Sequence, residues 1–355
     1  MAYTVEQLTG LVNATIAQYG RKKVTDIASD IQEYVVMDKL MKENKISYAG
    51  GDNYQFNVTK TLGSNARHTA LFETDDVNVT DSIVQGTVKW CFTDTSYAFD
   101  TREKAINSGD EVQIVDHIRL RRDREMAGLT ELCEQDFWAN NAVDSTTDKT
   151  PYGLPYWVCK VASGYTTITD HDFVGGDPSG FTGGAAGLPV ATYPNYQNYA
   201  GNYSTVEKDD LIKAMRRAHR LTKFKSPIKH PNYDSSGLSE KYQIYVNLDT
   251  IQEMEEVGEA QNDNLGRDLA SMDGSITFRK NPIMWIPYLD SDATDPVYMI
   301  NWGVFHMACL KDWVLKETTK PAPQQHNVVE TFVDLGWNTA CEDRRKQAVL
   351  SKEAS

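Results

Sequence analysis

The sequence predicts an α+β fold, on three observations. Residues 1–44 repeat apolar side chains at helical spacing, whereas residues 54–92 alternate apolar and polar side chains as a pair of strands does. A single long helical stretch follows at 108–141. Beyond residue 204, short helical and strand-like runs are mixed in the manner of a compact α+β domain.

Composition limits the class of protein. The 355 residues suffice for one large or two ordinary domains, and the net charge of -14 argues against a dedicated nucleic-acid binder. The first 30 residues lack a signal-peptide pattern and no apolar run reaches the length of a membrane span, so we expect a soluble protein that is not secreted. Five cysteines without close pairs favour a reducing compartment and predict neither a disulfide framework nor a zinc knuckle.

The N-terminal segment is expected to form two amphipathic helices. Thr4 and Gln7 form a box-like cap ahead of the first helix, and the second carries an apolar face. The residues of that second face are Ile27, Ile31, Tyr34, Val35 and Leu40. Such an arm has too little core to fold alone, so we expect it to pack on another body.

A long β-hairpin is predicted next. Tyr54, Phe56 and Val58 alternate with polar residues, and the returning strand places Val84, Val88, Trp90 and Phe92 in the same way. A two-stranded excursion is not stable alone in water, so we expect it to lie against a neighbouring subunit. The candidate intersubunit contacts are Tyr54, Phe56, Val58, Lys60, Lys89 and Trp90.

The long helix begins with a capping box, in which Ser108 and Glu111 satisfy backbone amides reciprocally. A helix of roughly 30 residues within 108–141 forms a rod about 45 Å long. Its expected apolar face consists of Val112, Val115, Ile118, Leu129, Leu132, Cys133 and Phe137. Four arginines, Arg119, Arg121, Arg122 and Arg124, are interpreted as ion-pairing residues on a solvated face, the alternative being weak contact with a packaged polyanion.

The region after the long helix is expected to return as a buried strand at Tyr156–Val158 and then to form a long structured loop, 164–203. A capping box at Ser204–Glu207 is expected to open a helix that buries apolar residues. These are Leu211, Ile212, Met215 and Leu221.

The last third of the chain is expected to be mainly strands. They are predicted at 242–247, 275–279, 283–289, 297–302 and 328–337, with a short helix that ends at Gly258. We expect a linker at Lys320–Pro323 and a charged tail after residue 337.

Motifs for chemistry are weak throughout. The Gly-rich run 175–184 lacks the Lys of a phosphate loop, and the acidic run 290–295 lacks the Gly and the final Glu of a calcium loop. His171 has no partner at ligand spacing and is expected in a surface loop. We therefore predict no catalytic residue, no cofactor and no metal site.

Two alternatives from other functional classes stay open. One is a cytosolic hydrolase whose site is assembled from Asp, His and Tyr in the Gly/Tyr-rich loop. The other is a carbohydrate-binding phage accessory protein that uses tyrosines of this loop. Those tyrosines are Tyr193, Tyr196, Tyr199 and Tyr203.

The order of modules, together with the phrases Tyr152–Val158 and Asp210–Ala218, resembles the major capsid proteins of tailed bacteriophages with the Hong Kong 97 type fold. The resemblance implies an N-terminal arm, an extended hairpin called the E-loop, a peripheral domain with the long spine helix and the Gly-rich loop, and an axial domain. Their respective ranges would be 1–45, 46–100, 101–205 and 206–318, with 319–355 returning to the peripheral domain and forming the tail.

The resemblance also implies a function without catalysis. The chain would be a structural subunit of an icosahedral phage head, assembling with copies of itself into hexamers and pentamers that enclose double-stranded DNA. Scaffolding, portal and decoration proteins would be further partners, with weak non-specific contact to the packaged DNA and none to a membrane. The expected location is the virion, with assembly in the host cytoplasm.

Overall fold

The computed structural model describes residues 34–42, 46–60, 67–74, 82–102, 111–139, 142–161, 163–223, 242–261, 276–279, 281–322 and 326–353. The first expected helix of the arm lies outside these ranges, as do Ile27, Ile31 and the cap residue Ser108. Within the described ranges, no helix combines the length and the apolar character that crossing a bilayer requires.

The chain forms two compact units. The first unit comprises Met1–Asp38, Phe92–Glu134 and Asp312–Gly336. The second unit comprises Lys39–Cys91, Gln135–Lys311 and Trp337–Ser355. Neither unit is continuous in sequence, so the modules predicted from the chain order do not follow this division.

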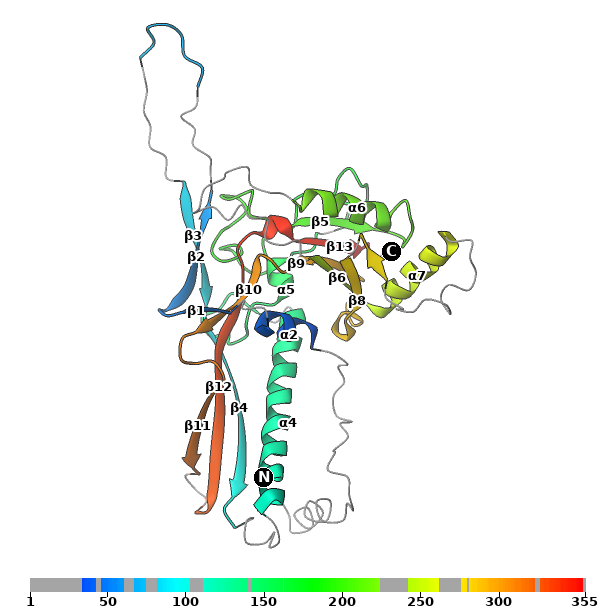
Figure 1. The fold of residues 1–355 in the computed structure, drawn as a ribbon. Coiled ribbons are helices and arrows are strands. Elements are labelled where there is room, and N and C mark those ends of the chain that lie inside the picture. The colour runs from blue at the N-terminus through cyan, green and yellow to red at the C-terminus, as the bar shows by residue number, and fades with distance from the viewer. Residues whose placement is uncertain are drawn as a thin grey trace. The chain divides into compact units, whose positions relative to one another are not determined.

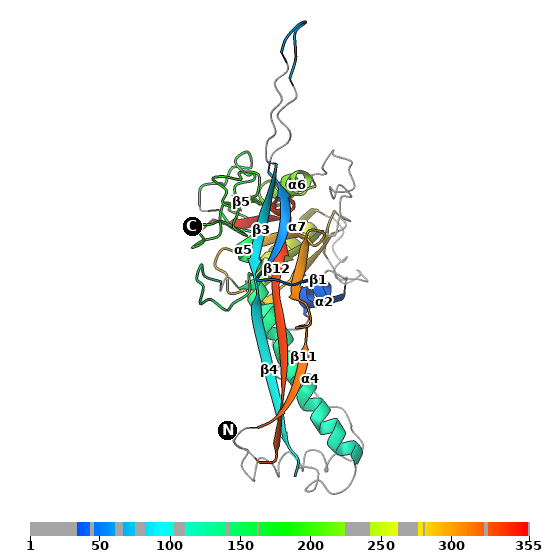
Figure 2. The same cartoon turned by 90° about the vertical axis from the view of Figure 1, so that its left-hand side faces the viewer.

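The first unit combines one long helix with a small sheet. Helix α4 spans Glu111–Trp138, and the strands are β4 (Cys91–Asp100), β11 (Lys316–Pro321) and β12 (Val328–Cys341). Strand β12 pairs with both β11 and β4, and the β11 pairing is antiparallel. In the part of these elements that belongs to the first unit, α4 runs alongside β4 in two views (Figure 1 and Figure 2).

The predicted long helix is present from Glu111 to Trp138. Leu129, Cys133 and Phe137 are buried as expected, because a spacing of four residues keeps side chains on one helix face. The expectation for Leu132 was wrong: it is 43% exposed, and the carboxylate of Glu134 occupies a buried position instead.

Glu134 is buried because it caps another helix. Helix α2 spans Val35–Lys42, and the amides of Val36 and Met37 donate to the Glu134 carboxylate. The first amides of a helix have no partner within it, so this carboxylate supplies the acceptor that they lack. The second predicted helix of the arm is confirmed for its described part.

The second unit contains a six-stranded mixed sheet in the order β5-β13-β9-β6-β8-β7. Its strands are β5 (Tyr199–Tyr203), β13 (Ala348–Lys352), β9 (Val297–Asn301), β6 (Tyr242–Val246), β8 (Asn281–Trp285) and β7 (Thr277–Phe278). Helices α6 (Leu211–Leu221) and α7 (Leu248–Gln261) contribute buried residues to the core on one face.

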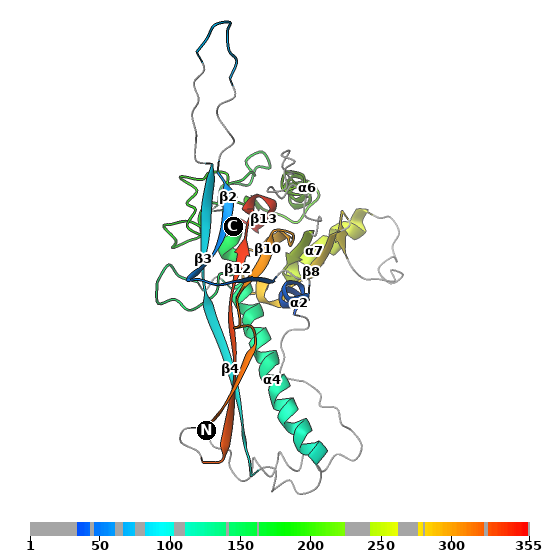
Figure 3. The same ribbon diagram turned by 60° about the vertical axis from the view of Figure 1, so that its left-hand side comes forward.

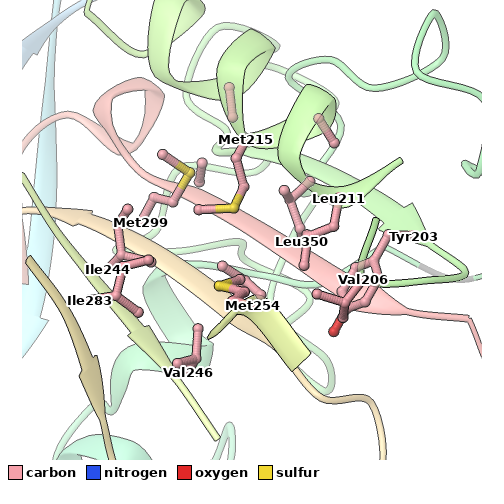
Figure 4. Close-up of a cluster of buried hydrophobic side chains, with 14 of the residues drawn as sticks. Tyr203, Val206, Leu211, Met215, Ile244, Val246, Met254, Ile283, Met299 and Leu350 are labelled. Atoms are coloured by element: carbon pink, nitrogen blue, oxygen red, sulfur yellow. The ribbon is translucent and has the colours of Figure 1, made fainter. Parts of the chain in front are cut away.

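That core follows the alternation of the strands. Ile244 and Met299 lie opposite each other in β6 and β9, and they pack with Leu350 of β13 against Met215 of α6 and Met254 of α7 (Figure 4). Successive strand residues point to opposite faces, so the intervening residues of these strands lie on the other side of the sheet.

The C-terminal segment corrects an expectation. In place of a charged tail, β13 pairs with β5 in parallel and with β9 in antiparallel orientation, and Ala348, Val349 and Leu350 are fully buried. A five-residue strand followed by charged residues carries too short an alternation to stand out in the sequence. Its pairing partners lie far away in the chain.

A second sheet region of this unit forms around β10 (Phe305–Leu310), which was not predicted. It pairs in parallel with β1 (Ile46–Ala49) and in antiparallel orientation with the end of β12, where Phe305 lies opposite Cys341. The predicted last strand therefore continues beyond residue 337.

The predicted hairpin is present as β2 (Asn53–Thr59) and β3 (Ile83–Lys89), which run side by side (Figure 3). Tyr54 lies opposite Val88, so the register matches the alternation. The expected burial of Phe92 was wrong, since it is 61% exposed. Strand β3 ends at Lys89 and β4 begins at Cys91, which is buried, so the inward positions shift by one residue there.

Two further expectations failed because local turns replaced regular elements. Tyr156 lies in a short helix, α5 (Leu154–Trp157), not in a strand, because Pro155 fits the first turn of a helix. Helix α6 begins at Leu211 because the Asp210 carboxylate accepts the amides of Ser204 and Thr205 at 2.8 and 2.9 Å, which holds that segment in turns.

Three further details also differ from the expectation. Leu221 was expected to be buried, but it is 37% exposed at the end of α6. Helix α7 does not end at Gly258 but continues to Gln261, because Gly258 is exposed and nothing crowds it. Lys320 and Pro321 belong to β11, not to a linker. Pro321 is the last residue of this strand, where a missing amide donor is tolerated.

Candidate assembly surface

The inner face of the hairpin is already covered by its own subunit. The Tyr54 hydroxyl lies 2.8 Å from Nε2 of His306, and the ring packs edge-on against His306 and Trp90. Phe56 lies over Gly86, where a Cβ atom would come within 2.5 Å of the ring. Any contact of this hairpin with another chain therefore has to use residues other than Tyr54 and Phe56.

The remaining hairpin candidates lie at the two ends of the paired strands, Lys89 and Trp90 at the base and Val58 and Lys60 at the opposite end. Lys89 donates to the Asp148 carboxylate at 2.9 Å, and Trp90 donates to the carbonyl of Gly51 at 2.8 Å. Val58 is half-buried opposite Val84, and the backbone amide of Lys60 donates to Ser82. Their role between subunits stays a prediction.

Asp148 organises the loop beneath Lys89. Partial burial acts to raise the pKa of this carboxyl, but donors from Val143, Lys89 and Thr150 outweigh it and lower the pKa to about 2. The carboxylate is therefore ionised and fully engaged at neutral pH. Lys89 holds the strand end to this loop.

Three of the four arginines of α4 contact their own unit. Arg122 forms a forked pair with Glu317 of β11 through Nε at 2.8 Å and Nη2 at 2.5 Å. Arg121 donates to the carbonyl of Ala98 at 3.1 Å, and Arg124 pairs with the adjacent Glu125. Arg119 is exposed. The contacts of Arg121 and Arg122 hold α4 to β4 and β11, and contact with a polyanion stays a prediction.

The tyrosine-rich loop is folded inward. Tyr196, Tyr199 and Tyr203 are buried, and the hydroxyls of Tyr196 and Tyr203 donate to the carbonyls of Cys341 and Asp295 at 2.7 and 2.6 Å. Stacking on a sugar or a base needs an exposed aromatic face, which these three side chains do not offer. Tyr193 is partly exposed.

The expected surface position of His171 was wrong. Its side chain is fully buried, with Nε2 2.8 Å from the carbonyl oxygen of Asn202 and the ring lying over Gly201. Burial lowers the pKa of His171, since the charged imidazole is disfavoured away from water. The ring is a neutral packing element of the core.

A buried guanidinium, which sequence reasoning missed, ties together the segments after α4. Arg344 is fully buried and donates to the carbonyls of Trp157, Gly176 and Tyr196 and to Oδ1 of Asn198, at 2.7 to 3.1 Å. Asn198 also accepts the amide of Cys159. No periodic pattern marks either residue, so only the packed structure reveals this cluster.

The acidic run 290–295 serves structural contacts. Asp290 accepts the amide of Leu248 at 2.8 Å, and Asp295 pairs with Lys352 at 3.3 Å. Asp292 pairs with Lys160. Among the residues that the structure describes, no group of three or more His, Cys, Asp or Glu side chains could hold a metal ion.

The cysteines of the chain are not prepared for nucleophilic chemistry. All five are free and buried, and desolvation raises the pKa of Cys91 and of Cys309 to about 12. A thiol is reactive as the thiolate, and at neutral pH a pKa this high leaves almost none.

A pocket of about 650 Å³ opens on the second unit. Its apolar lining comes from Trp138, Pro155, Tyr288 and Leu289. The polar lining is already in use: Lys160 pairs with Asp292, and the Asp177 carboxylate accepts the amide of Val190. These groups offer a binding surface, not an acid–base pair aimed at a substrate.

Comparison with known proteins identifies the fold. No protein-family model and no curated protein matches the sequence. Among solved structures, the cyanophage A-1(L) capsid asymmetric unit matches with a TM-score of 0.58 at 12% identity, over 97% of this chain and 99% of that one. The capsid of a native GTA particle matches with a TM-score of 0.52 at 14% identity, over 96% and 99%.

A shell protein of another kind matches as well. The holo-SrpI encapsulin complex from Synechococcus elongatus PCC 7942 gives a TM-score of 0.50 at 12% identity, over 99% of this chain and 96% of that one. Coverage is almost complete in both directions. At these identities the likeness concerns the fold alone, and the predicted α+β class with a Hong Kong 97 type architecture is confirmed at that level.

Proposed function

We propose that this chain is the structural subunit of an icosahedral phage head, whose copies form hexamers and pentamers around double-stranded DNA. The observation that carries the proposal is a likeness of fold that spans nearly all of this chain and nearly all of a cyanophage capsid chain. The candidate sites support it, because Asp148, Asp292 and Arg344 are engaged in structural contacts.

The modules follow from the same proposal. Residues 1–45 would be the N-terminal arm, 46–100 the E-loop around β2 and β3, and 101–205 the peripheral domain with α4 as the spine. The axial domain, 206–318, would also need β5 and β13, because both strands belong to the sheet that contains β6 and β9. Residues 319–341 would return to the peripheral domain through β11 and β12.

The partners and the location belong to the proposal too. Copies of the chain are the principal partners, and scaffolding, portal and decoration proteins are candidates for the others. The chain would act in the virion after assembly in the host cytoplasm, without catalysis and without a membrane. The burial of Tyr196, Tyr199 and Tyr203 weighs against the carbohydrate-binding and hydrolase alternatives.

An encapsulin-like shell is a second candidate, favoured by the match to the SrpI encapsulin complex. The two candidates differ in what the shell encloses. Particles that form only around protein, and exclude DNA when assembled in its presence, would favour the encapsulin-like role.

Removal of the tip of the hairpin tests the proposal, because the excursion between β2 and β3 is the part expected to need a neighbouring subunit. A variant in which Gly63–Thr80 is replaced by a short Gly-Ser linker should fold, because the inner face of β2 and β3 packs within the second unit. It should fail to form shells that the intact chain forms under the same conditions. Normal shells from the deletion variant would show that the E-loop assignment is wrong.

A further inference from the structure

Helix α6 carries a stripe of positive charge on its exposed face. Lys213, Arg216 and Arg220 are exposed, and steps of three and four residues keep them on one side of the helix. Lys213 lies two residues from both Leu211 and Met215, which are buried, so the stripe points away from the core. None of these three cations forms an ion pair with a residue that the structure describes. We call them the cationic stripe.

Helix α7 carries a stripe of the opposite sign. Asp249, Glu253 and Glu256 are exposed and follow one another by four and three residues, so they share one side of α7. Within the described part of the chain, their carboxylates also form no ion pair. Like charges at this spacing on a helix repel each other, so a covering surface of opposite charge would stabilise each helix. We call these three residues the acidic stripe.

The two stripes have the same spacing when one helix is reversed. Steps of three and then four residues lead from Lys213 to Arg220, and the same steps lead backward from Glu256 to Asp249. At about 1.5 Å per residue both stripes are about 10.5 Å long, so antiparallel helices would place every cation opposite a carboxylate. The pairs are Lys213 with Glu256, Arg216 with Glu253, and Arg220 with Asp249.

Another copy of the chain can supply the partner for each stripe. Both helices belong to the second unit, yet among its described residues no ion pair joins α6 to α7. Because one chain carries both stripes at different places, copies can join head to tail, the cationic stripe of one against the acidic stripe of the next. A nucleic acid would cover the cationic stripe only, and its phosphates would repel the acidic stripe. The charge pattern thus favours a second copy.

We propose that α6 of one copy docks antiparallel to α7 of the next copy through these three ion pairs. The inference rests on the proposed function and names a surface by which copies of the subunit recognise one another. A single exposed ion pair contributes little, but a contact repeated around a ring of copies acts many times. Complementary charge also selects the partner and fixes the register, since any shifted docking brings like charges together.

Charge reversal tests this contact. Reversing either stripe alone should raise the protein concentration for half-assembly at least about tenfold, because like charges then face each other. Reversing both stripes in one chain should restore assembly to within about threefold of the intact chain, since every pair re-forms with its signs exchanged. Light scattering follows assembly, and circular dichroism verifies the fold. The substitutions are Lys213→Glu, Arg216→Glu and Arg220→Glu in α6, and Asp249→Lys, Glu253→Lys and Glu256→Lys in α7.

A matched control changes the net charge elsewhere on the second unit. Asp52→Lys, Asp144→Lys and Asp170→Lys replace exposed carboxylates outside α7 and change the net charge as much as reversal of the acidic stripe does. The control should assemble within about threefold of the intact chain. An equal loss in the control, or no recovery in the doubly reversed chain, overturns the inference. So does a reversed α6 that lowers the retention of DNA and leaves assembly unchanged, because the cationic stripe would then serve a nucleic acid.

A disulfide between copies locates the contact whether or not shells close. Chains with Arg216→Cys, mixed with isotopically labelled chains with Glu253→Cys, should form an interchain disulfide at these positions under mild oxidation, since the five native cysteines are buried. Shells without this disulfide, or mass spectrometry that finds residue 216 joined elsewhere, overturn the inference. If the disulfide forms but the intact chain never builds shells, the proposed function fails and the contact stands, so the two failures are distinguishable.

Discussion

Glu134 of α4 accepts the backbone amide of Met37 at 3.0 Å, and the carboxylate is buried within the first unit. The same oxygen lies 3.1 Å from the amide of Val36. A side chain from a helix almost 100 residues away thus caps the start of α2. The capping residue is not adjacent in sequence, which is why no local motif announces it.

Removing that carboxylate should destabilise the protein. Glu134→Ala leaves two buried amides without an acceptor, and we expect a loss of about 2–4 kcal/mol in the free energy of unfolding. Glu134→Gln keeps one acceptor oxygen and should lose less. Urea denaturation measures both. Glu131→Ala, at a partly exposed position of the same helix, is the control, and an equal loss there would refute the capping role.

The Arg344 cluster should be intolerant of substitution. Arg344→Met strands three carbonyl oxygens, and Arg344→Lys replaces a fork of donors by a single ammonium group, so each should lose about 3 kcal/mol or more. The control is Arg345→Met, whose partly exposed pair with Asp343 should contribute at most about 1 kcal/mol. Similar midpoints of thermal unfolding for the two Met variants would contradict this account.

Gly201 should tolerate no side chain while His171 is present. A Cβ atom there would lie 2.5 Å from the imidazole ring, so Gly201→Ala should lose about 1–3 kcal/mol through overpacking. Adding His171→Ala should recover part of that loss, which a double-mutant cycle detects as non-additivity. Gly128→Ala, in an open position of α4, should instead stabilise by about 0.5–1 kcal/mol. Additive effects at 201 and 171 would rule out the steric explanation.

The buried His171 should make stability depend on pH below neutrality. Its folded-state pKa is lowered by burial, whereas the unfolded chain binds a proton as the pH falls below about 6.5. Below about pH 6.5 the unfolded chain binds a proton that the folded chain does not, so protons favour unfolding. The free energy of unfolding therefore falls by up to about 1.4 kcal/mol per pH unit as the pH decreases toward the folded-state pKa. Asp210 and Arg217 are the charged neighbours that act on this pKa.

Urea denaturation from pH 7.5 to 5 gives the free energy of unfolding of the intact chain and of His171→Gln. The difference between these two free energies should change with pH over this window. A constant difference would show that the imidazole is not held neutral by the fold.

The elements with long, regular patterns could be predicted from the sequence. The alternation around Tyr54 and Val88 predicts the hairpin and its register, and the spacing of Leu129, Cys133 and Phe137 predicts the buried face of α4. In these cases the local pattern and the tertiary packing agree, so periodicity alone is sufficient.

Features that depend on distant partners could not be predicted. Strand β13 is short and finds its partners in β5 and β9, more than 45 residues away in sequence. Arg344 and His171 lie in polar surroundings in the sequence, yet both become buried because carbonyl groups from other segments surround them. Burial of such residues follows from contacts that form only when the chain has folded.

Cryo-electron microscopy of the purified chain is the decisive test of whether it builds shells. We expect closed icosahedral particles built from hexamers and pentamers, with density for each subunit that fits the six-stranded sheet of the second unit. A single species with the mass of one chain, at concentrations where shell proteins assemble, would contradict it.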